Sequence, residues 1–316
     1  MKSLIGIDIG GTKCALVRGD ANGNVTEKIR FETTGYQDTL ARILKEAEAL
    51  SKDALAVGVS CGGPLDEKRG MILSPPNLPG WDQVPIVELL QERLGIPAAL
   101  RNDANACALA EWMYGAGRGT QNMAFMTFGT GLGAGLILNG RLYGGTTGMA
   151  GEVGHWRLSP HGPSGYGKCG SFEGFCSGTG LWELGRGLAR EYLQRGEMPA
   201  FLKSKDCGSF TVAEMAQAAR QGDPCAREAF ATCGDMLGRG LALMADILDP
   251  EVIVIGSVYA RCRDLLEEPA LKRMAAECLP QIMKTCKIKP AELGEQIGDV
   301  AALAVAAQAL REKEDK

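Results

Sequence analysis

Short apolar runs, separated by glycine and other turn residues, alternate with helical periodicity in the first third of the chain. Each apolar run has the length of a buried strand. The predicted strands are residues 4–8, 14–18, 54–60 and 98–101 and one that begins at Val25. The predicted helices are residues 39–50, 87–94 and 104–114. Strands that alternate with helices in this way predict an α/β domain.

A second set of elements of the same kind begins at residue 123. It predicts strands at 124–127, 134–138 and 252–255, a glycine turn at 129–133 and a long amphipathic helix at 225–248. Each half therefore opens with a strand–glycine turn–strand unit and later has a strand that ends in glycine. This duplication predicts two similar α/β domains with a ligand cleft between them. We expect a small domain at 1–117, completed by a helix at about 300–316, and a larger one at 118–299.

Length and charge narrow the class of protein. The chain has 316 residues, which favours two domains of about 150 residues each. Apolar residues make up 45% and charged residues 23%, as is typical of soluble globular proteins. The net charge of −4 argues against nucleic acid or an anionic membrane as the main partner. We find neither an apolar run of about 18 residues nor a signal peptide, and expect a cytoplasmic protein.

Cysteine and glycine contents add two expectations. The 11 cysteines include no C-x-x-C pair, so we expect reduced, mostly buried thiols. The 43 glycines are about twice the average share, and many of them cluster between apolar strands. Clustered glycine predicts turns or a close approach of the backbone to a ligand.

The first glycine turn carries residues suited to phosphate. Asp8 ends a predicted strand and is followed by Gly10, Gly11, Thr12 and Lys13. Glycines let backbone N–H groups converge on phosphate oxygens, and the lysine could neutralise phosphate charge. Asp8 could hold Mg²⁺ through its water ligands. A tight hairpin with an incidental acid is the alternative.

The second glycine turn repeats this design. It contains Thr130, Gly131 and Gly133, whose hydroxyl and N–H groups could hold further phosphates. No G-K-[ST] follows, so the turn is not a P-loop. One glycine-rich turn is weak evidence, but two that recur in a duplicated plan indicate a nucleotide site.

Three further positions offer polar groups in suitable places. Asp103 lies where a predicted strand turns into a helix, and its spacing alone fits a helix N-cap as well as a catalytic acid. Glu152 and His155 offer acceptors and a donor that suit sugar hydroxyls. The chain has only two histidines, although a lone histidine is often structural.

Together these motifs resemble a known family. The segments D-I-G-G-T-K, G-T-G-L-G-A-G-L and A-G-E-V-G-H are similar to those of the ROK family of sugar kinases and sugar-responsive repressors. The resemblance covers residues 5 to about 306. It implies an actin-like, hexokinase-type (RNase H-like) duplicated two-domain α/β fold. It also implies ATP with Mg²⁺ as the phosphoryl donor.

The resemblance also implies residue roles. The Asp of N-D-A-N, here Asp103, is the general base that accepts the proton of the sugar hydroxyl during phosphoryl transfer. The residues that match sugar-binding positions are Gly63, Asn77, Asn102, Asp103, Glu152, His155 and Glu173. Gly256 matches a nucleotide-contacting glycine, and Ser257 replaces a glycine often seen beside it.

One element departs from the family. Similar proteins usually bind structural zinc with three cysteines and the histidine. Those cysteine positions here hold Ser164, Tyr166 and Ser171, and Cys169 falls between them. One cysteine and one histidine cannot close a four-ligand site, so we predict no zinc. Hydrogen bonds or packing, with Tyr166 a candidate, must then hold His155 and Glu173.

The leading functional hypothesis is an ATP-dependent hexose kinase, with glucose as the first substrate to test. Alternatives are N-acetylmannosamine, N-acetylglucosamine or fructose as substrate, and a sugar-binding sensor without catalysis. The family's repressors carry a helix-turn-helix domain before the first glycine turn. That turn starts at residue 8 here, so a DNA-binding regulator is not expected. Homodimerisation is an expectation carried over from similar proteins.

Overall fold

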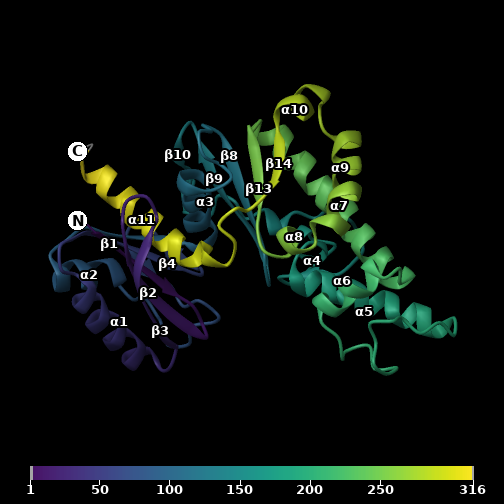
Figure 1. The fold of residues 1–316 in the computed structure, drawn as a ribbon, viewed down its shortest axis with the longest axis horizontal. Helices are drawn as coiled ribbons and strands as arrows, with labels where there is room; N and C mark the ends of the chain where they lie inside the picture. Colours follow the sequence, from purple (N-terminus) through teal and green to yellow (C-terminus); the bar gives the residue numbers. More distant parts are fainter. Residues whose placement is uncertain (1–2, 315–316) are drawn as a thin grey trace. The chain divides into compact units, whose positions relative to one another are not determined.

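The structure is a computed structural model that describes residues 3–314. The chain forms two compact units (Figure 1). The first unit contains the described residues up to 121, residues 135–150 and those from 292 onward. The second unit contains residues 122–134 and 151–291.

A five-stranded sheet of order β3-β2-β1-β4-β7 forms the centre of the first unit. Its strands are β1 (Ser3–Ile9), β2 (Lys13–Gly19), β3 (Val25–Glu32), β4 (Ala54–Cys61) and β7 (Ala98–Asn102). Strand β4 runs parallel to β1 and to β7, whereas β2 is antiparallel to β1 and β3. Parallel neighbours end at the same edge of a sheet. The turns after β1, β4 and β7 therefore lie side by side.

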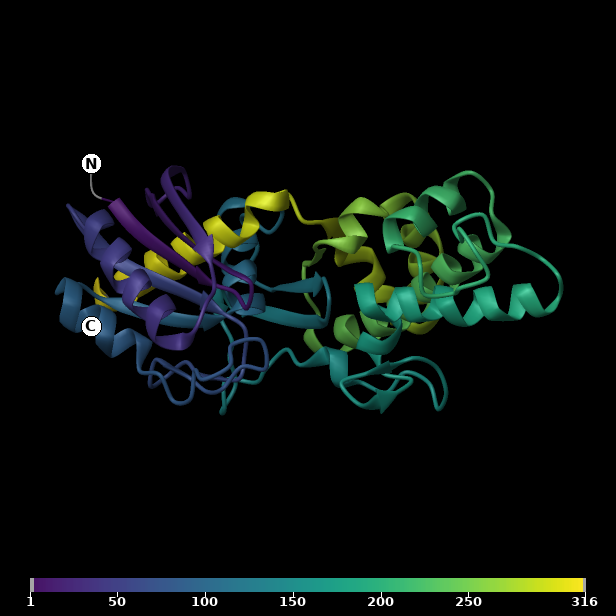
Figure 2. The ribbon, with the colours of Figure 1, turned by 90° about the horizontal axis from the view of Figure 1, so that it is seen from below.

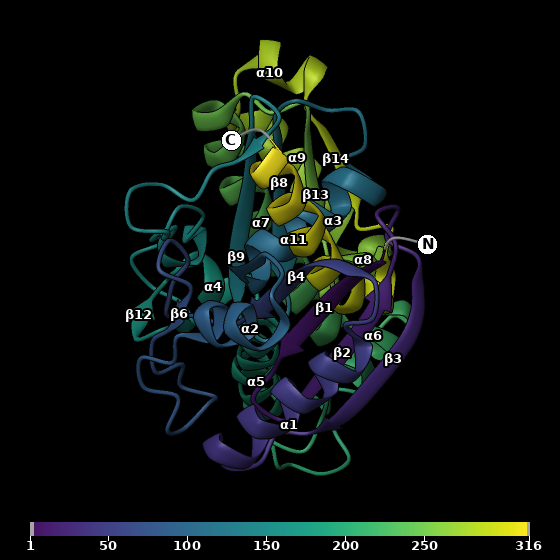
Figure 3. The ribbon, with the colours of Figure 1, turned by 90° about the vertical axis from the view of Figure 1, so that its left-hand side faces the viewer.

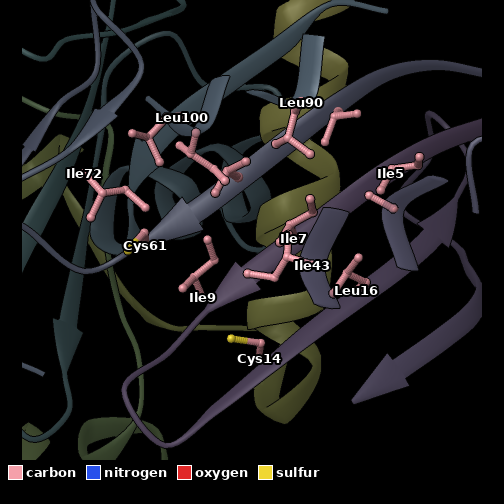
Figure 4. Packing of buried hydrophobic residues seen from close by; sticks show 14 of the residues in the cluster. Ile5, Ile7, Ile9, Cys14, Leu16, Ile43, Cys61, Ile72, Leu90 and Leu100 are labelled. Carbon is pink, nitrogen blue, oxygen red and sulfur yellow. The ribbon is translucent and has the colours of Figure 1, made fainter. Parts of the chain in front are cut away.

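Helices cover both faces of this sheet. The remaining elements of the unit are α1 (Tyr36–Leu50), β5 (Leu65–Asp66), β6 (Met71–Ile72), α2 (Ile86–Leu94), α3 (Asp103–Tyr114), β10 (Arg141–Leu142), η2 (Gly294–Gln296) and α11 (Ile297–Glu314). On one face Ile5, Ile7 and Ile9 pack with Ile43 of α1 and Leu90 of α2 (Figure 4). These alternate residues of β1 point to one face because side chains alternate along a strand.

The opposite face packs against α11. Leu4 of β1 and Ala56 of β4 form a second cluster with Leu303 and Ala306 of that helix. Helix α11, drawn in yellow, lies beside β1 and β4 in two perpendicular views (Figures 1 and 3). The alanine-rich sequence of α11 lets it pack closely on the sheet. This packing buries both faces of the central strands, as their apolar sequences require.

The second unit combines parallel strands with many helices (Figure 2). Strand β13 (Val252–Ile255) lies between β8 (Met123–Phe128) and β14 (Lys287–Pro290) and is parallel to both. The whole sheet has the order β10-β9-β8-β13-β14, and the residues of β9 (Leu132–Leu138) are divided between the two units. The other elements are η1 (Val153–His155), β11 (Ser164–Gly165), β12 (Lys168–Cys169), α4 (Phe172–Phe175), α5 (Gly178–Gln194), α6 (Val212–Arg220), α7 (Pro224–Leu248), α8 (Val258–Arg261), α9 (Arg263–Glu277) and α10 (Pro280–Thr285).

The cysteines and the lengths of the apolar helices bear on two of the expectations from the sequence. All 11 cysteines are free thiols and most of them are buried, as expected for a reduced protein. No helix within residues 3–314 has both the length and the apolar sequence needed to cross a bilayer.

Candidate active site

The first glycine turn joins β1 to β2. Asp8 lies one residue before the end of β1, and the backbone N–H of Gly10 donates a 3.1 Å hydrogen bond to the carbonyl of Lys13. A Cβ atom on Gly11 would lie 2.7 Å from the Cβ of Asn77. Only glycine therefore allows the segment of Asn77 to approach the turn this closely. Gly11, predicted to bind phosphate, and Asn77, predicted to bind sugar, are therefore neighbours.

The strand register brings further candidates to the same edge. Asp8 is paired with Ser60, and Cys61 is paired with Asn102 at the ends of β4 and β7. Gly63 follows β4, and a Cβ atom there would lie 3.5 Å from the side-chain nitrogen of Asn102. The first unit therefore places the ends of three strands, with their polar residues, at one edge.

Asp103 opens α3 but is not its N-cap. Asn102 holds the N-cap position, and its Oδ1 accepts a 3.0 Å hydrogen bond from the N–H of Ala104. The helix is thus capped without Asp103, although Asp103 Oδ1 also accepts from Ala104 at 2.8 Å. The N-cap interpretation left open by the sequence is therefore wrong. The Asp103 carboxylate is available for another purpose.

The two carboxylates of this edge have perturbed pKa values. Desolvation raises the pKa of Asp103, and hydrogen bonds from backbone N–H groups oppose the rise. Asp103 is exposed to solvent as a residue, yet protein atoms surround its carboxylate closely enough to desolvate it. Desolvation, followed by the charges of Asp103 and Asp299, raises the pKa of Asp8 to about 6. Shifts of this kind are common at functional sites.

Glu67 supports this edge, and no sequence motif pointed to it. Its Oε1 accepts hydrogen bonds from the backbone N–H of Asn102 at 2.8 Å and from Asn105 Nδ2 at 3.0 Å. Its side chain is only 12% exposed. Glu67 belongs to a run of charged residues, which is typical of a solvated turn. Its role in holding the start of α3 is visible only in three dimensions.

The second glycine turn forms part of a cavity in the second unit. The cavity has a volume of about 590 Å³. Its lining residues are Gly129, Thr130, Gly178, Thr179, Trp182, Val212, Ser257, Val258 and Arg261. The carbonyl of Gly129 accepts from the N–H of Gly178 at 2.7 Å, and that of Thr130 from the hydroxyl of Thr179 at 3.1 Å. These bonds join the turn to the start of α5.

The sequence anticipated only part of this cavity. Thr130 lines it, whereas Gly131, Gly133 and Gly256 are not among the lining residues. A Cβ atom on Gly131 would lie 2.8 Å from Glu173 Oε2, so this glycine faces a predicted sugar ligand. The wall formed by α5, α6 and α8 was not predicted. The run Ser177-Gly178-Thr179-Gly180 was its one visible signal in the sequence.

The expected sugar residues of the second unit lie on two short segments. Glu152 directly precedes η1, and His155 ends it, and both are exposed. Glu173 lies on α4 and is half-buried, and its Oε2 accepts a 3.0 Å hydrogen bond from the N–H of Leu132. That bond ties Glu173 to the glycine turn of the cavity.

The segment between His155 and Glu173 is held by side-chain contacts. The ring of Tyr166 meets His155 edge-on, with centroids 4.9 Å apart. The ammonium of Lys168 donates a 2.6 Å hydrogen bond to the carbonyl of His155. The fully buried hydroxyl of Ser171 accepts from the N–H groups of Gly165 and Gly174, each at 3.1 Å.

These residues do not fit a structural zinc ion. Serine hydroxyls and a tyrosine ring stand where thiolates would be needed, and zinc sites of this type use cysteine and histidine. Within residues 3–314, no group of three or more His, Cys, Asp or Glu side chains is arranged to hold a metal ion. The absence of zinc stays a prediction, and the contacts of Ser171, Lys168 and Tyr166 are what supports the loop.

Known proteins similar to this chain identify its family. The chain matches the ROK family over residues 4–309. It is 34% identical to a glucokinase from Streptomyces coelicolor, with 85% of this chain and 86% of that protein covered. It is 31% identical to an N-acetylgalactosamine kinase from Shewanella sp., with 83% of each covered. One solved structure is that of a ROK family glucokinase from Streptomyces griseus in complex with glucose and AMPPNP, which is 31% identical to this chain. The two structures superpose with a TM-score of 0.77, over 97% of this chain and 99% of that one.

The chain therefore belongs to the ROK family. It is a sugar kinase of the actin-like, hexokinase-type α/β fold. The fold and family that the three similar segments implied are thereby confirmed.

Proposed function

We propose that this protein transfers the γ-phosphoryl group of ATP to a hydroxyl of a hexose, with glucose as the favoured substrate and Asp103 as general base. The position of Asp103 carries the proposal. It follows the N-cap Asn102 at the edge where Asp8 and Gly63 also lie. Its raised pKa makes its carboxylate a stronger proton acceptor than an ordinary aspartate at neutral pH.

The cavity of the second unit suits the nucleotide. Gly129 and Thr130 would hold phosphates, and the aromatic ring of Trp182 would pack against the base. In the first unit Gly10, Gly11, Thr12 and Lys13 would hold further phosphate oxygens. Gly131, Gly133 and Gly256 are also proposed to contact the nucleotide through their backbone, although they are not among the residues that line the cavity.

Magnesium fits the chemistry of Asp8. The charges of Asp103 and Asp299 both disfavour an ionised Asp8, so a cation nearby would relieve the repulsion. We propose that Asp8 holds Mg²⁺ through water ligands. The ion would neutralise charge on the phosphates during transfer.

Asn77, Gly63 and Asn102 of the first unit, with Glu152, His155 and Glu173 of the second, are the proposed sugar ligands. Glucose is favoured because glucokinases are among the relatives described above. An acetylated amino sugar is the second candidate, favoured by the N-acetylgalactosamine kinase relative. A non-catalytic sensor would keep the sugar ligands without needing Asp103.

The test is ADP release from Mg·ATP with a panel of hexoses and N-acetylhexosamines. We expect turnover with glucose and a higher kcat/KM for glucose than for any acetylated sugar. A preference for an N-acetylhexosamine would replace the substrate but keep the enzyme class. Tight sugar binding by calorimetry without any ADP release would identify a sensor and refute the kinase proposal.

A further inference from the structure

Ser257 has a backbone conformation that serine rarely adopts. Its φ is 53° and its ψ is −114°. This lies outside the left-handed helical region and in a part of φ/ψ space that is essentially restricted to glycine. Ser257 is the N-cap of α8, but its side chain makes no capping hydrogen bond. No capping hydrogen bond from the Ser257 side chain therefore offsets the strain.

The neighbouring residues hold this conformation in place. The N–H of Gly256 donates a 2.9 Å hydrogen bond to the carbonyl of Met126 in β8. The carbonyl of Ser257 accepts from the N–H of Arg261 at 3.3 Å, and Val258 is buried. The connection from β13 to α8 is thus fixed on both sides of Ser257. A glycine at position 257 could adopt the same backbone conformation without strain. Serine differs from glycine only by its hydroxymethyl group.

Ser257 is one of the residues that line the 590 Å³ cavity. The Ser257 Oγ lies 3.9 Å, and the Thr127 Oγ1 3.6 Å, from the place where a Cβ atom on Gly129 would stand. The open side of Gly129 therefore faces two hydroxyls. Within residues 3–314, neither hydroxyl has a hydrogen-bond partner. Two unpartnered donors beside a glycine turn are suited to an anionic oxygen.

We infer that the Ser257 hydroxyl donates a hydrogen bond to a phosphate oxygen of the nucleotide held by the Gly129 turn. This inference rests on the proposed function, because it takes the cavity to be the nucleotide site. It makes Ser257 a nucleotide-binding residue. The strained backbone persists because it aims the hydroxyl into the cavity.

Two substitutions separate the hydroxyl from the strain. Ser257→Ala removes the hydroxyl but keeps a Cβ atom, and therefore keeps most of the strain. Ser257→Gly removes both. ADP binding is measured by titration calorimetry, and the melting temperature is measured without ligand. We expect both variants to bind ADP about tenfold more weakly, as for loss of one hydrogen bond to a charged group. Only Ser257→Gly should melt higher, by about 2 °C or more.

Three results would count against the inference in different ways. Wild-type affinity for ADP in Ser257→Ala would show that the hydroxyl does not touch the nucleotide. A melting temperature unchanged in Ser257→Gly would show that the backbone is not strained. If the wild-type protein itself did not bind ADP, the proposed function would fail along with the inference. An unchanged affinity for sugar in both variants is expected, because the effect is confined to the nucleotide.

Discussion

Replacing Asp8 by asparagine is expected to stabilise the protein above pH 6 while impairing its activity. Asp8 lies partly buried at the end of β1, and desolvation is the largest cause of its raised pKa. The charges of Asp103 and Asp299 add to the rise, and those of Lys28 and Arg30 oppose it. An ionised Asp8 is therefore unfavourable in the folded state. Asparagine has nearly the same shape and no charge.

The size and sign of the effect follow from the pKa. It rises from 3.8 to about 6 on folding, and each pKa unit is worth 1.36 kcal/mol, so the full effect is about 3 kcal/mol. Because the folded state holds this proton more tightly, wild-type stability falls as the pH rises from about 4 to 6. Above that range the penalty is constant. Asp8→Asn never carries the penalty, so it should gain about 1–3 kcal/mol above pH 6 and almost nothing below pH 4.

Urea unfolding at several pH values between 3.5 and 8 measures this difference. Asp38→Asn is the matched control, because Asp38 is an exposed acid in the first turn of α1. The difference between wild type and Asp8→Asn should open between pH 4 and 6, and the control should show no such opening. A variant that is equally stable or less stable than wild type at pH 7.5 would refute the electrostatic reasoning.

Three further predictions concern two structural side chains and the absence of zinc. The buried Glu111 carboxylate accepts from the N–H groups of Ala116, Glu292 and Leu293 at 2.8, 3.2 and 3.0 Å. Glu111→Ala removes the shared acceptor of these three hydrogen bonds and should lower the unfolding free energy by about 3 kcal/mol or more. A loss under about 1 kcal/mol in urea unfolding would contradict this. Dialysis against a strong chelator should leave the melting temperature unchanged, and sugar phosphorylation should be unchanged once Mg²⁺ is restored. Elemental analysis should find less than about 0.1 zinc ion per chain, which is the detection background. Ser171→Ala should lower the free energy of unfolding by about 1–3 kcal/mol and raise the KM for sugar more than the KM for ATP. Zinc found at one ion per chain would overturn this account of the segment between His155 and Glu173.

The sequence predicted the elements with strong periodicity or strong end signals. The expected helix at 225–248 is α7, which begins at Pro224 with Asp223 as its cap and ends at Leu248. Proline in the first turn and a regular apolar stripe are reliable helix signals. The strands that precede the glycine turns were also located within about two residues. Such local signals do not depend on the rest of the fold.

Helix α5 was not predicted from the sequence. Four glycines occur among its residues, in GTGLWELGRG, and glycine weakens a helical signal, so no helix was predicted there. In the structure Gly180 and Gly185 are buried, because the helix packs there against neighbouring chain segments. Missing this helix also meant missing Thr179 and Trp182 of the cavity wall. Glu67 was missed for the opposite reason, since its partners in β7 and α3 are far away in sequence.

The central claim is that Asp103 accepts the proton of the sugar hydroxyl. The most direct test measures glucose phosphorylation and glucose binding by Asp103→Asn, beside the first-turn control Asp38→Asn. Our account predicts a loss in kcat of at least about 100-fold for Asp103→Asn, with folding and ATP binding retained and the control unchanged. Turnover by Asp103→Asn within a few-fold of wild type would contradict the account, because another group would then be the base.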